Sequence, residues 1–291
     1  MAANYSCIAV LNCDKLRSGL PFWRTLFDEI LILTSFNLLL LTATITPAGG
    51  APNLARFDPK VRLADYQTAL RFYLSICGEV FDKIIFVENS NSDLSSLAAI
   101  AAEAGRSDDI EFISFYGLDY PTSYDRGYGE CKLLDYAMET SVFVRDGFKS
   151  HGENLKIWKV TGRYIIRNVR QIVRQQPKNF ELYCNYRNHP MRVTDMFLMA
   201  WTVPGYQFYL KDVYPKLKLT DEDHNNGVGP ECLLRVELDK KPKKPLLIKR
   251  VLFTPEIVGK RAGDDTEYSV KNRWKYNIRR LILRFFPWVW I

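Results

Sequence analysis

The sequence predicts an α/β fold with a mostly parallel β-sheet and helices on both faces. Short apolar runs alternate with stretches of helical spacing over the first half of the chain, and this strand–helix order is typical of a parallel sheet. The 291 residues, of which 47% are apolar, suffice for one large domain with a sizeable core. Charged residues make up 25% of the chain and aromatic residues 13%, which argues against disorder.

The order of the elements follows from the apolar runs and from the residues that interrupt them. The first strand is expected at 38–45, because the Pro- and Gly-rich stretch 46–52 stops it. Ser92 or Asp93 can cap a helix expected at 94–104. On the same grounds, helices are expected at 65–77 and 127–140, and strands at 83–87, 110–115 and 155–161. Ligands bind such sheets at the carboxyl ends of the strands, so the site is expected in the loops that follow them.

Composition narrows the choice of partners and cofactors. The net charge of +7 and the pI near 9.0 indicate an anionic partner, a class that includes nucleic acid, anionic lipid and nucleotide diphosphates. The six cysteines show no CxxC or metal-finger spacing, which predicts reduced thiols and a cytosolic compartment. The three histidines form no HxxxH pattern, so no zinc site is expected and no cofactor is indicated.

The two ends of the chain differ from its middle. The apolar stretch 30–45 is shorter than the roughly 20 residues of a membrane span, and no basic region precedes it as in a signal peptide. A short helix followed by the first strand is expected there, with a membrane anchor as the alternative. The last residues interleave basic and aromatic side chains, which favours an amphipathic helix in a membrane interface over a helix docked on the core. The expected division is an N-terminal helical extension (1–37), a central catalytic domain (38–267) and a basic aromatic tail (268–291).

Polar residues end or follow the first two predicted strands. Glu88 and Asn89 come after KIIFV, and an acid at a strand end can accept hydrogen bonds from a uracil base or a ribose. Thr42 and Thr44 offer hydroxyl and backbone contacts to a base. Ordinary turns are the alternative interpretation.

A glycine-rich segment, DRGYGECKLLDYA, opens the helix expected at 127–140. Gly127 permits close approach to the helix N-terminus, where free N–H groups favour an anion. Arg126 and Lys132 add positive charge beside it. A tight loop that leads into a helix would give the same pattern.

The fourth predicted strand ends in KVTGRY. Thr161 and Gly162 stand at its carboxyl end, and Arg163 follows them. A guanidinium matches phosphate oxygens in a bidentate fork, so Arg163 is a candidate partner for a diphosphate.

In their order, LLLTATI, FVENSNSD, RGYGECKLLDYA and KVTGRY resemble the landmarks of the GT-A glycosyltransferases over roughly residues 38–215. They are similar to sets found in bacterial capsule and O-antigen enzymes. Most members of the superfamily hold a divalent metal with an acidic DxD motif at the position of KVTGRY, and this chain has no acid there. The resemblance implies a GT-A-like, Rossmann-like fold and a nucleotide-sugar donor, most often a UDP-sugar. Arg163 would then neutralise the leaving diphosphate, while a divalent metal stays possible.

The resemblance also implies catalytic residues. Inverting members place a general base just before a helix, often ahead of a Gly-Tyr pair, and Asp195 occupies the matching place before Gly205. The alternative for Asp195 is an N-cap on a buried helix. Glu231, in the GPE segment, is the second candidate base. Family members also close a C-terminal loop over the donor, and the resemblance implies this role for Lys260 and Arg261. The alternative is a flexible surface loop with solvated charges.

The main hypothesis is an enzyme that moves a sugar from a nucleotide donor to a hydroxyl of a glycan or glycolipid acceptor. It would work at the cytoplasmic face of a membrane, which the tail contacts. One alternative is a non-catalytic module that binds membrane or nucleic acid, although no RNA-binding motif accompanies the basic tail and no nucleic-acid partner is expected. Another is a sugar nucleotidyltransferase, for which the usual Gly-rich opening loop and acidic metal ligands are missing from the sequence.

Overall fold

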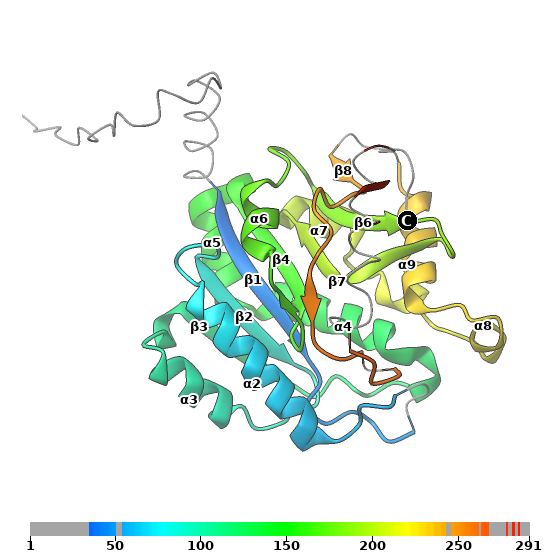
Figure 1. Cartoon of the computed structure of the whole chain (residues 1–291), viewed down its shortest axis with the longest axis horizontal. Helices are drawn as coiled ribbons and strands as arrows, with labels where there is room; N and C mark the ends of the chain where they lie inside the picture. The colour runs from blue at the N-terminus through cyan, green and yellow to red at the C-terminus, as the bar shows by residue number, and fades with distance from the viewer. Residues whose placement is uncertain are drawn as a thin grey trace, which may run out of the picture. The chain divides into compact units, whose positions relative to one another are not determined.

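A computed structural model describes residues 35–50, 54–242, 246–261 and 263–267, together with Ile278, Leu281, Ile282 and Phe285 (Figure 1). The chain divides into two units, 1–35 and 36–291, and the described residues lie almost entirely in the second. The predicted N-terminal extension and most of the predicted tail lie outside the described residues, so the three-part division stays a prediction. The first strand begins at Phe36, two residues before the expected start of the central domain.

The centre of the second unit is a seven-stranded, mostly parallel sheet (Figure 1). The strands β3, β2, β1 and β4 run parallel to one another, β7 is antiparallel to both of its neighbours, and β8 is parallel to β6. In spatial order they are β3 (Ile110–Ser114), β2 (Lys83–Glu88), β1 (Phe36–Ala43), β4 (Leu155–Thr161), β7 (Val193–Trp201), β6 (Leu182–Arg187) and β8 (Leu247–Ile248). A separate antiparallel pair joins β5 (Ile165–Ile166) to β9 (Ile257–Val258).

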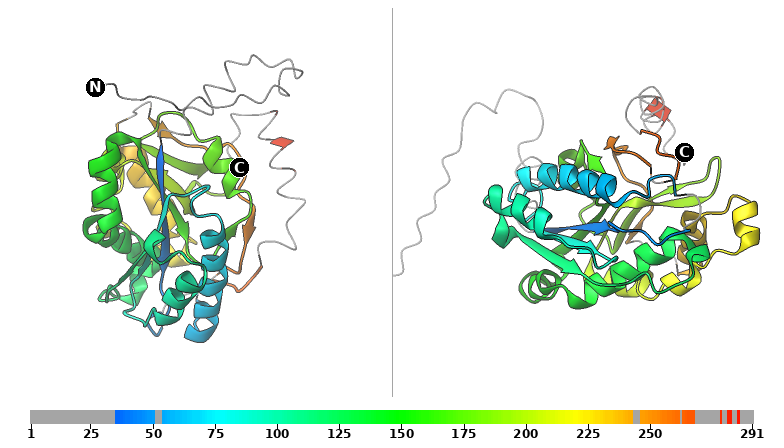
Figure 2. Two further views of the ribbon diagram at one scale, coloured as in Figure 1. Left: turned by 90° about the vertical axis from the view of Figure 1, so that its left-hand side faces the viewer. Right: turned by 90° about the horizontal axis from the view of Figure 1, so that it is seen from below.

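Helices cover both faces of the sheet, as Figure 2 shows. Helices α2 (Pro59–Ser75), α3 (Ser95–Glu103) and α6 (Val169–Arg174) pack on one face. The opposite face carries α4 (Asp125–Thr140), α5 (Val142–His151), α7 (Val203–Tyr209) and α9 (Pro230–Lys240), and the short α8 (Asp221–Asn225) precedes α9. The expected Rossmann-like class, a mostly parallel sheet with helices on both faces, is therefore confirmed.

The central strand explains why the chain folds this way. Leu39 and Leu41 of β1 are buried against α2 and its neighbours, whereas Leu38 and Leu40 are buried against α4 and α5. Successive side chains of a strand point to opposite faces, so a run of four leucines can be buried only between two layers.

One stretch departs from the prediction. Residues 193–201 were expected to lead into a helix, but they form β7, which pairs with β4 and β6. The strand is covered on both faces, so its apolar run lacks the alternation that marks a half-exposed strand. The helix that follows is α7, and Thr202, rather than Asp195, caps it by accepting a hydrogen bond from the Gly205 N–H. The N-cap interpretation of Asp195 is thus wrong.

Two further observations concern the predicted compartment and membrane contact. Cys77, Cys131, Cys184 and Cys232, the cysteines in the described part of the chain, are free thiols. No helix within the described ranges is both long and apolar enough to cross a bilayer.

Candidate active site

A pocket of about 710 Å³ lies at the carboxyl ends of β1 and β4. Its wall draws on both faces of the sheet: α2 on one side, α4 and the start of α9 on the other, and the β6–β7 pair at one end. Loops that precede α2 and follow β8 complete the wall. This is the place where open α/β sheets bind ligands, as the sequence predicted.

The strand ends supply polar groups to this wall. Thr42, Thr44, Asn89 and Thr161, all predicted donor contacts, line the pocket. The Thr44 hydroxyl donates a hydrogen bond to Asn89 Oδ1 (2.7 Å), and this bond orients the Asn89 amide. The other end of the amide, Nδ2, makes no hydrogen bond with the described residues. Tyr66 on α2 accepts a hydrogen bond from the Thr44 N–H (2.9 Å). These hydrogen bonds connect the residues that follow β1 to the end of β2 and to α2.

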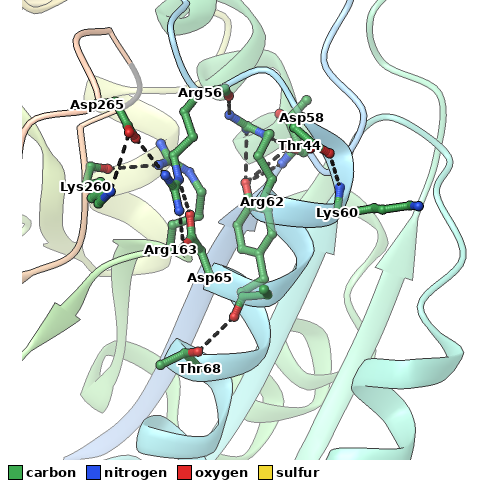
Figure 3. A network of polar contacts seen from close by, with 12 residues as sticks. Thr44, Arg56, Asp58, Lys60, Arg62, Asp65, Thr68, Arg163, Lys260 and Asp265 are labelled. Carbon is green, nitrogen blue, oxygen red and sulfur yellow. Dashed lines mark hydrogen bonds and ion pairs between the residues drawn. The ribbon is translucent and has the colours of Figure 1, made fainter.

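Two buried arginines line the pocket on the α2 side. Arg62 is 5% exposed and Arg163 is 7% exposed. Arg62 Nε donates to the Thr44 carbonyl (2.7 Å), and Arg163 Nη1 donates to the Lys260 carbonyl (3.1 Å). Arg163 Nε is buried without a hydrogen-bond partner among the described residues. Figure 3 shows both side chains beside the ion pair of Arg56 with Asp65.

Neither of these two guanidiniums contacts a carboxylate within the described residues. Burial, together with the positive charges of Arg163 and Arg126, lowers the pKa of Arg62 from its ordinary value. A buried charge is costly unless it is paired, so this side of the pocket favours an anion. Arg126, a predicted donor contact, also lines the pocket and pairs with Asp125 (3.2 Å).

An ion-pair network ties the loops around the pocket (Figure 3). Arg56 pairs with Asp65 on α2 (2.5 Å) and with Asp265 near the end of the described chain (2.6 Å). The predicted loop residue Arg261 lines the pocket. The loop before α2 and the loop after β9 are therefore held together across more than 200 positions of sequence.

The two candidate bases have different surroundings. Asp195 is buried in β7, where it accepts hydrogen bonds from Asn185 Nδ2 (2.8 Å) and from Arg187 Nε (2.8 Å), with Arg187 Nη2 at 2.7 Å. Glu231 stands in the first turn of α9, and no hydrogen bond or ion pair joins its carboxylate to another described side chain. Burial, with the negative Glu130 as a further cause, raises the pKa of Glu231. The Asp195 carboxylate is thus already bonded to its neighbours, whereas that of Glu231 has a raised pKa and no described side-chain partner.

Sequence reasoning missed the pair at the floor of the pocket. Lys159 on β4 is fully buried, and its Nζ lies 2.5 Å from Glu130 Oε1 on α4. Arg62, Tyr66 and Arg187 were missed as well. Only the fold could reveal them, because the sequence around them carries no motif.

Five predicted donor contacts lie outside the pocket wall: Glu88, Gly127, Lys132, Gly162 and Lys260. The Glu88 carboxylate is buried and accepts N–H bonds from Ile45 (2.9 Å), Ser90 (2.9 Å) and Ser92 (3.0 Å). It fastens the ends of β1 and β2 to each other, so the proposed contact with a base or ribose is corrected.

The two glycines among these five residues, Gly127 and Gly162, lie where the chain packs closely against its neighbours. A Cβ on Gly127 would lie 2.1 Å from the Cβ of Pro230, and a Cβ on Gly162 would lie 2.8 Å from the Thr42 carbonyl oxygen. Gly127 thus seats α4 closely against α9.

The two lysines among these five residues, Lys132 and Lys260, lie beside carboxylates. Lys132 pairs with Asp119, and Lys260 Nζ lies 3.5 Å from Asp265. Lys260 also contributes its backbone carbonyl to Arg163.

No group of three or more His, Cys, Asp or Glu side chains within the described residues is arranged to hold a metal ion.

No protein-family model matches the chain, and no curated protein is significantly similar to it in sequence. Solved structures do resemble it in fold. A 4-diphosphocytidyl-2C-methyl-D-erythritol synthase from Anaerococcus prevotii has 11% identity and a TM-score of 0.40, with 88% of this chain and 99% of that chain covered. A nucleotide-diphospho-sugar transferase from Desulfovibrio desulfuricans has 10% identity and a TM-score of 0.38, with 70% and 74% covered.

A further 4-diphosphocytidyl-2C-methyl-D-erythritol synthase has 10% identity and a TM-score of 0.32, with 86% of this chain and 98% of that chain covered. Similarities at this level describe the path of the backbone and carry no information about activity.

Proposed function

We propose that this protein is a glycosyltransferase that uses a nucleotide-sugar donor. One observation carries the proposal: a single pocket at the strand ends contains two buried guanidiniums without a carboxylate partner, Arg62 and Arg163, together with an unpaired carboxyl of raised pKa, Glu231. Glycosyl transfer needs both features, because a diphosphate leaves with negative charge while an acceptor hydroxyl loses a proton.

In the proposed complex, the strand ends bind the nucleoside and the arginines bind the diphosphate. Thr44 and Asn89 lie where β1 and β2 end and present polar groups for a base or ribose. Arg62 and Arg163 stabilise the charge that develops on the leaving diphosphate, since guanidinium–phosphate hydrogen bonds are charge-assisted. Arg126 lies close enough to Arg62 to lower its pKa and adds a third positive charge.

The proposed reaction is a single displacement with Glu231 as the general base. The acceptor oxygen attacks the anomeric carbon of the sugar and its proton passes to the Glu231 carboxylate. The bond from that carbon to the phosphate oxygen breaks, and the nucleoside diphosphate leaves with the electron pair. Asp195 is less suited, because Asn185 and Arg187 already occupy its oxygens. We assign it the role of holding Arg187 in the wall.

The acceptor is proposed to be a glycan or glycolipid at a membrane surface, as in capsule or lipopolysaccharide synthesis. Among the described residues of the tail, Ile278, Leu281 and Phe285 are helical and exposed, at spacings of three and four residues. Residues so spaced share one face of a helix. Basic residues between them in the sequence would favour an anionic leaflet by about 1 kcal/mol each.

The first test is a screen of UDP, GDP, CMP and their sugars for thermal stabilisation of the full chain, with EDTA or with Mn²⁺. A ligand at about 100 times its Kd should stabilise the fold by about 2.7 kcal/mol. The screen is followed by transfer assays, and by a parallel assay for pyrophosphate release from a nucleoside triphosphate and a sugar phosphate. Release of pyrophosphate without sugar transfer would replace the proposal with a nucleotidyltransferase.

The Glu231→Gln variant tests the proposed base. It should lose about 10²- to 10⁴-fold in kcat and keep the Kd for the nucleotide. Because the pKa of Glu231 is raised, the wild-type rate should fall as the pH drops through a value above that of an ordinary glutamate. Asp195→Asn is the comparison variant. Loss of kcat in Asp195→Asn but not in Glu231→Gln would exchange the two assignments.

A further inference from the structure

The floor of the pocket contains one carboxylate whose two oxygens have different environments. Glu130 Oε1 lies 2.5 Å from Lys159 Nζ and accepts hydrogen bonds from the hydroxyls of Thr42 (2.8 Å) and Thr161 (3.3 Å). Every hydrogen bond and ion pair that the Glu130 carboxylate makes with described residues goes to Oε1. Glu130 lines the pocket, so Oε2 is the oxygen left for a bound molecule.

Lys159 holds this carboxylate in place. Its side chain is fully buried, and its other contacts are the Thr161 hydroxyl (3.2 Å) and the Met196 carbonyl. Glu130 is the one carboxylate among the described residues that it contacts. A buried ammonium needs a charged partner, and a carboxylate paired in this way is a hydrogen-bond acceptor.

We propose that Glu130 Oε2 accepts a hydrogen bond from a hydroxyl of the transferred sugar, so that the donor carries a neutral sugar such as a hexose. This inference rests on the proposed glycosyl transfer. A site built to hydrogen-bond a hydroxyl strongly rejects analogues that lack it, because its buried polar group is then left unpaired.

The surroundings of Glu130 favour an uncharged sugar over an acidic one. The negative charges of Glu130 and Asp125 both contribute to the raised pKa of Glu231. Three carboxyl groups therefore lie near one another on the α4–α9 side of the pocket. The buried arginines are on the α2 side, where the diphosphate is expected. A sugar carboxylate beside Glu130 would meet like charges, whereas a hydroxyl would donate to one of them.

The test uses the double variant Glu130→Gln/Lys159→Met. The single Glu130→Gln variant leaves the Lys159 charge buried alone and should lower the Tm, whereas removal of both members of a buried pair is often neutral for stability. Lys156→Met is the matched control, because Lys156 is also buried in β4 but near the opposite end of the strand from the pocket. Calorimetry then gives the Kd of UDP, UDP-glucose, UDP-galactose and UDP-glucuronate for each protein.

We expect the wild type and Lys156→Met to bind a neutral UDP-hexose about 10-fold or more tightly than UDP-glucuronate. The double variant should keep its affinity for UDP and lose that preference. A wild-type preference for UDP-glucuronate, or a preference for the neutral sugar that survives in the double variant, would overturn the inference. So would a parallel loss of UDP binding in the double variant. Failure of the wild type to bind any nucleotide would instead remove the proposed function, and this inference with it.

Discussion

At the scale of single residues, two kinds of arginine stand out in the described part of the chain. Arg56, Arg187 and Arg235 pair with aspartates at 2.5–2.8 Å. Arg62 and Arg163 are buried more deeply than most charged residues, yet no described carboxylate contacts them. Burial of a charge without a carboxylate contact is costly to a fold, and such residues are typical of functional sites. We therefore expect that removal of the Arg163 charge weakens ligand binding without lowering the stability of the fold.

The Arg163→Met variant should separate these effects. Loss of a charge-assisted hydrogen bond is worth about 1.5–3 kcal/mol, so the Kd for UDP should rise by about 10- to 100-fold. The Tm should be unchanged or higher, because a buried charge is replaced by an apolar chain of similar length. Both quantities follow from thermal shift and calorimetry on the same samples.

Arg71→Met is the control for Arg163→Met. Arg71 lies on the exposed side of α2, paired with Glu103 at 3.2 Å, and both side chains are more than half exposed. This variant should change neither the Kd nor the Tm measurably, since exposed ion pairs contribute little. Unaltered UDP binding in Arg163→Met would contradict the proposed diphosphate site.

The sequence revealed those site residues that directly follow strands. Thr44, Asn89 and Arg163 were found because strand ends in a parallel sheet converge on one edge. Lys159 could not be found, because a lysine within LKIWKVT looks like any solvent-facing residue of a strand until α4 is seen to bring Glu130 to it. Arg62 was missed for the same reason, as a basic residue in the first turn of a helix.

At the scale of elements, the contact between α4 and α9 sets the geometry of the acidic side of the pocket. Gly127 on α4 lies directly against Pro230 at the start of α9. Arg126 and Glu130 flank this contact on one helix, and Glu231 follows it on the other. A change in the spacing of the two helices would move all three charged groups together.

Gly127→Ala should therefore impair both stability and activity. The added Cβ would lie 2.1 Å from the Pro230 Cβ, and overpacking of this kind costs about 1–3 kcal/mol. Denaturant unfolding and transfer assays measure the two effects. Gly49→Ala is the control, because a Cβ at Gly49 would meet no atom within 4 Å. If Gly127→Ala behaved as this control does, the assigned role of the contact would be wrong.

Helices and strands could be predicted where the spacing of apolar residues along the sequence was regular. The first four long strands were found to within a few residues, because short apolar runs end at polar turns. Helix α2 begins at Pro59, six residues earlier than expected, because Asp58 caps it and accepts the Lys60 N–H (2.8 Å). Strand β7 could not be found, because burial on both faces removes the alternation that distinguishes a strand from a buried helix.

At the scale of the whole molecule, buried carboxyl groups shape the dependence of folding on pH. Burial raises the pKa of Asp135 to about 6, against an ordinary value of 3.8, although Tyr206 and the Asp212 N–H both donate to it. Burial raises the pKa of Glu231 as well. A group whose pKa is raised by folding stabilises the fold below its unfolded pKa, and this stabilisation is lost as the pH rises through the folded value.

The Asp135→Asn variant should therefore gain stability relative to wild type as the pH rises. The difference in free energy of unfolding between the two proteins should move in favour of the variant from pH 4 to pH 7, with most of the change below about pH 6. Urea unfolding at a series of pH values measures it. Asp146→Asn, at an exposed position, should show no such trend. A constant difference for Asp135→Asn would mean that folding does not raise this pKa.

The pairing of Lys159 with Glu130 also constrains how this protein can diverge over evolution. Replacement of one partner leaves the other charge buried alone, whereas replacement of both restores neutrality. Intermediates between the two states would fold poorly and be removed by selection. Descendant sequences should therefore change these two positions together or not at all, even though 29 positions separate them along the chain. Under the proposed function, lineages that lose the pair would be those that bind a different donor sugar.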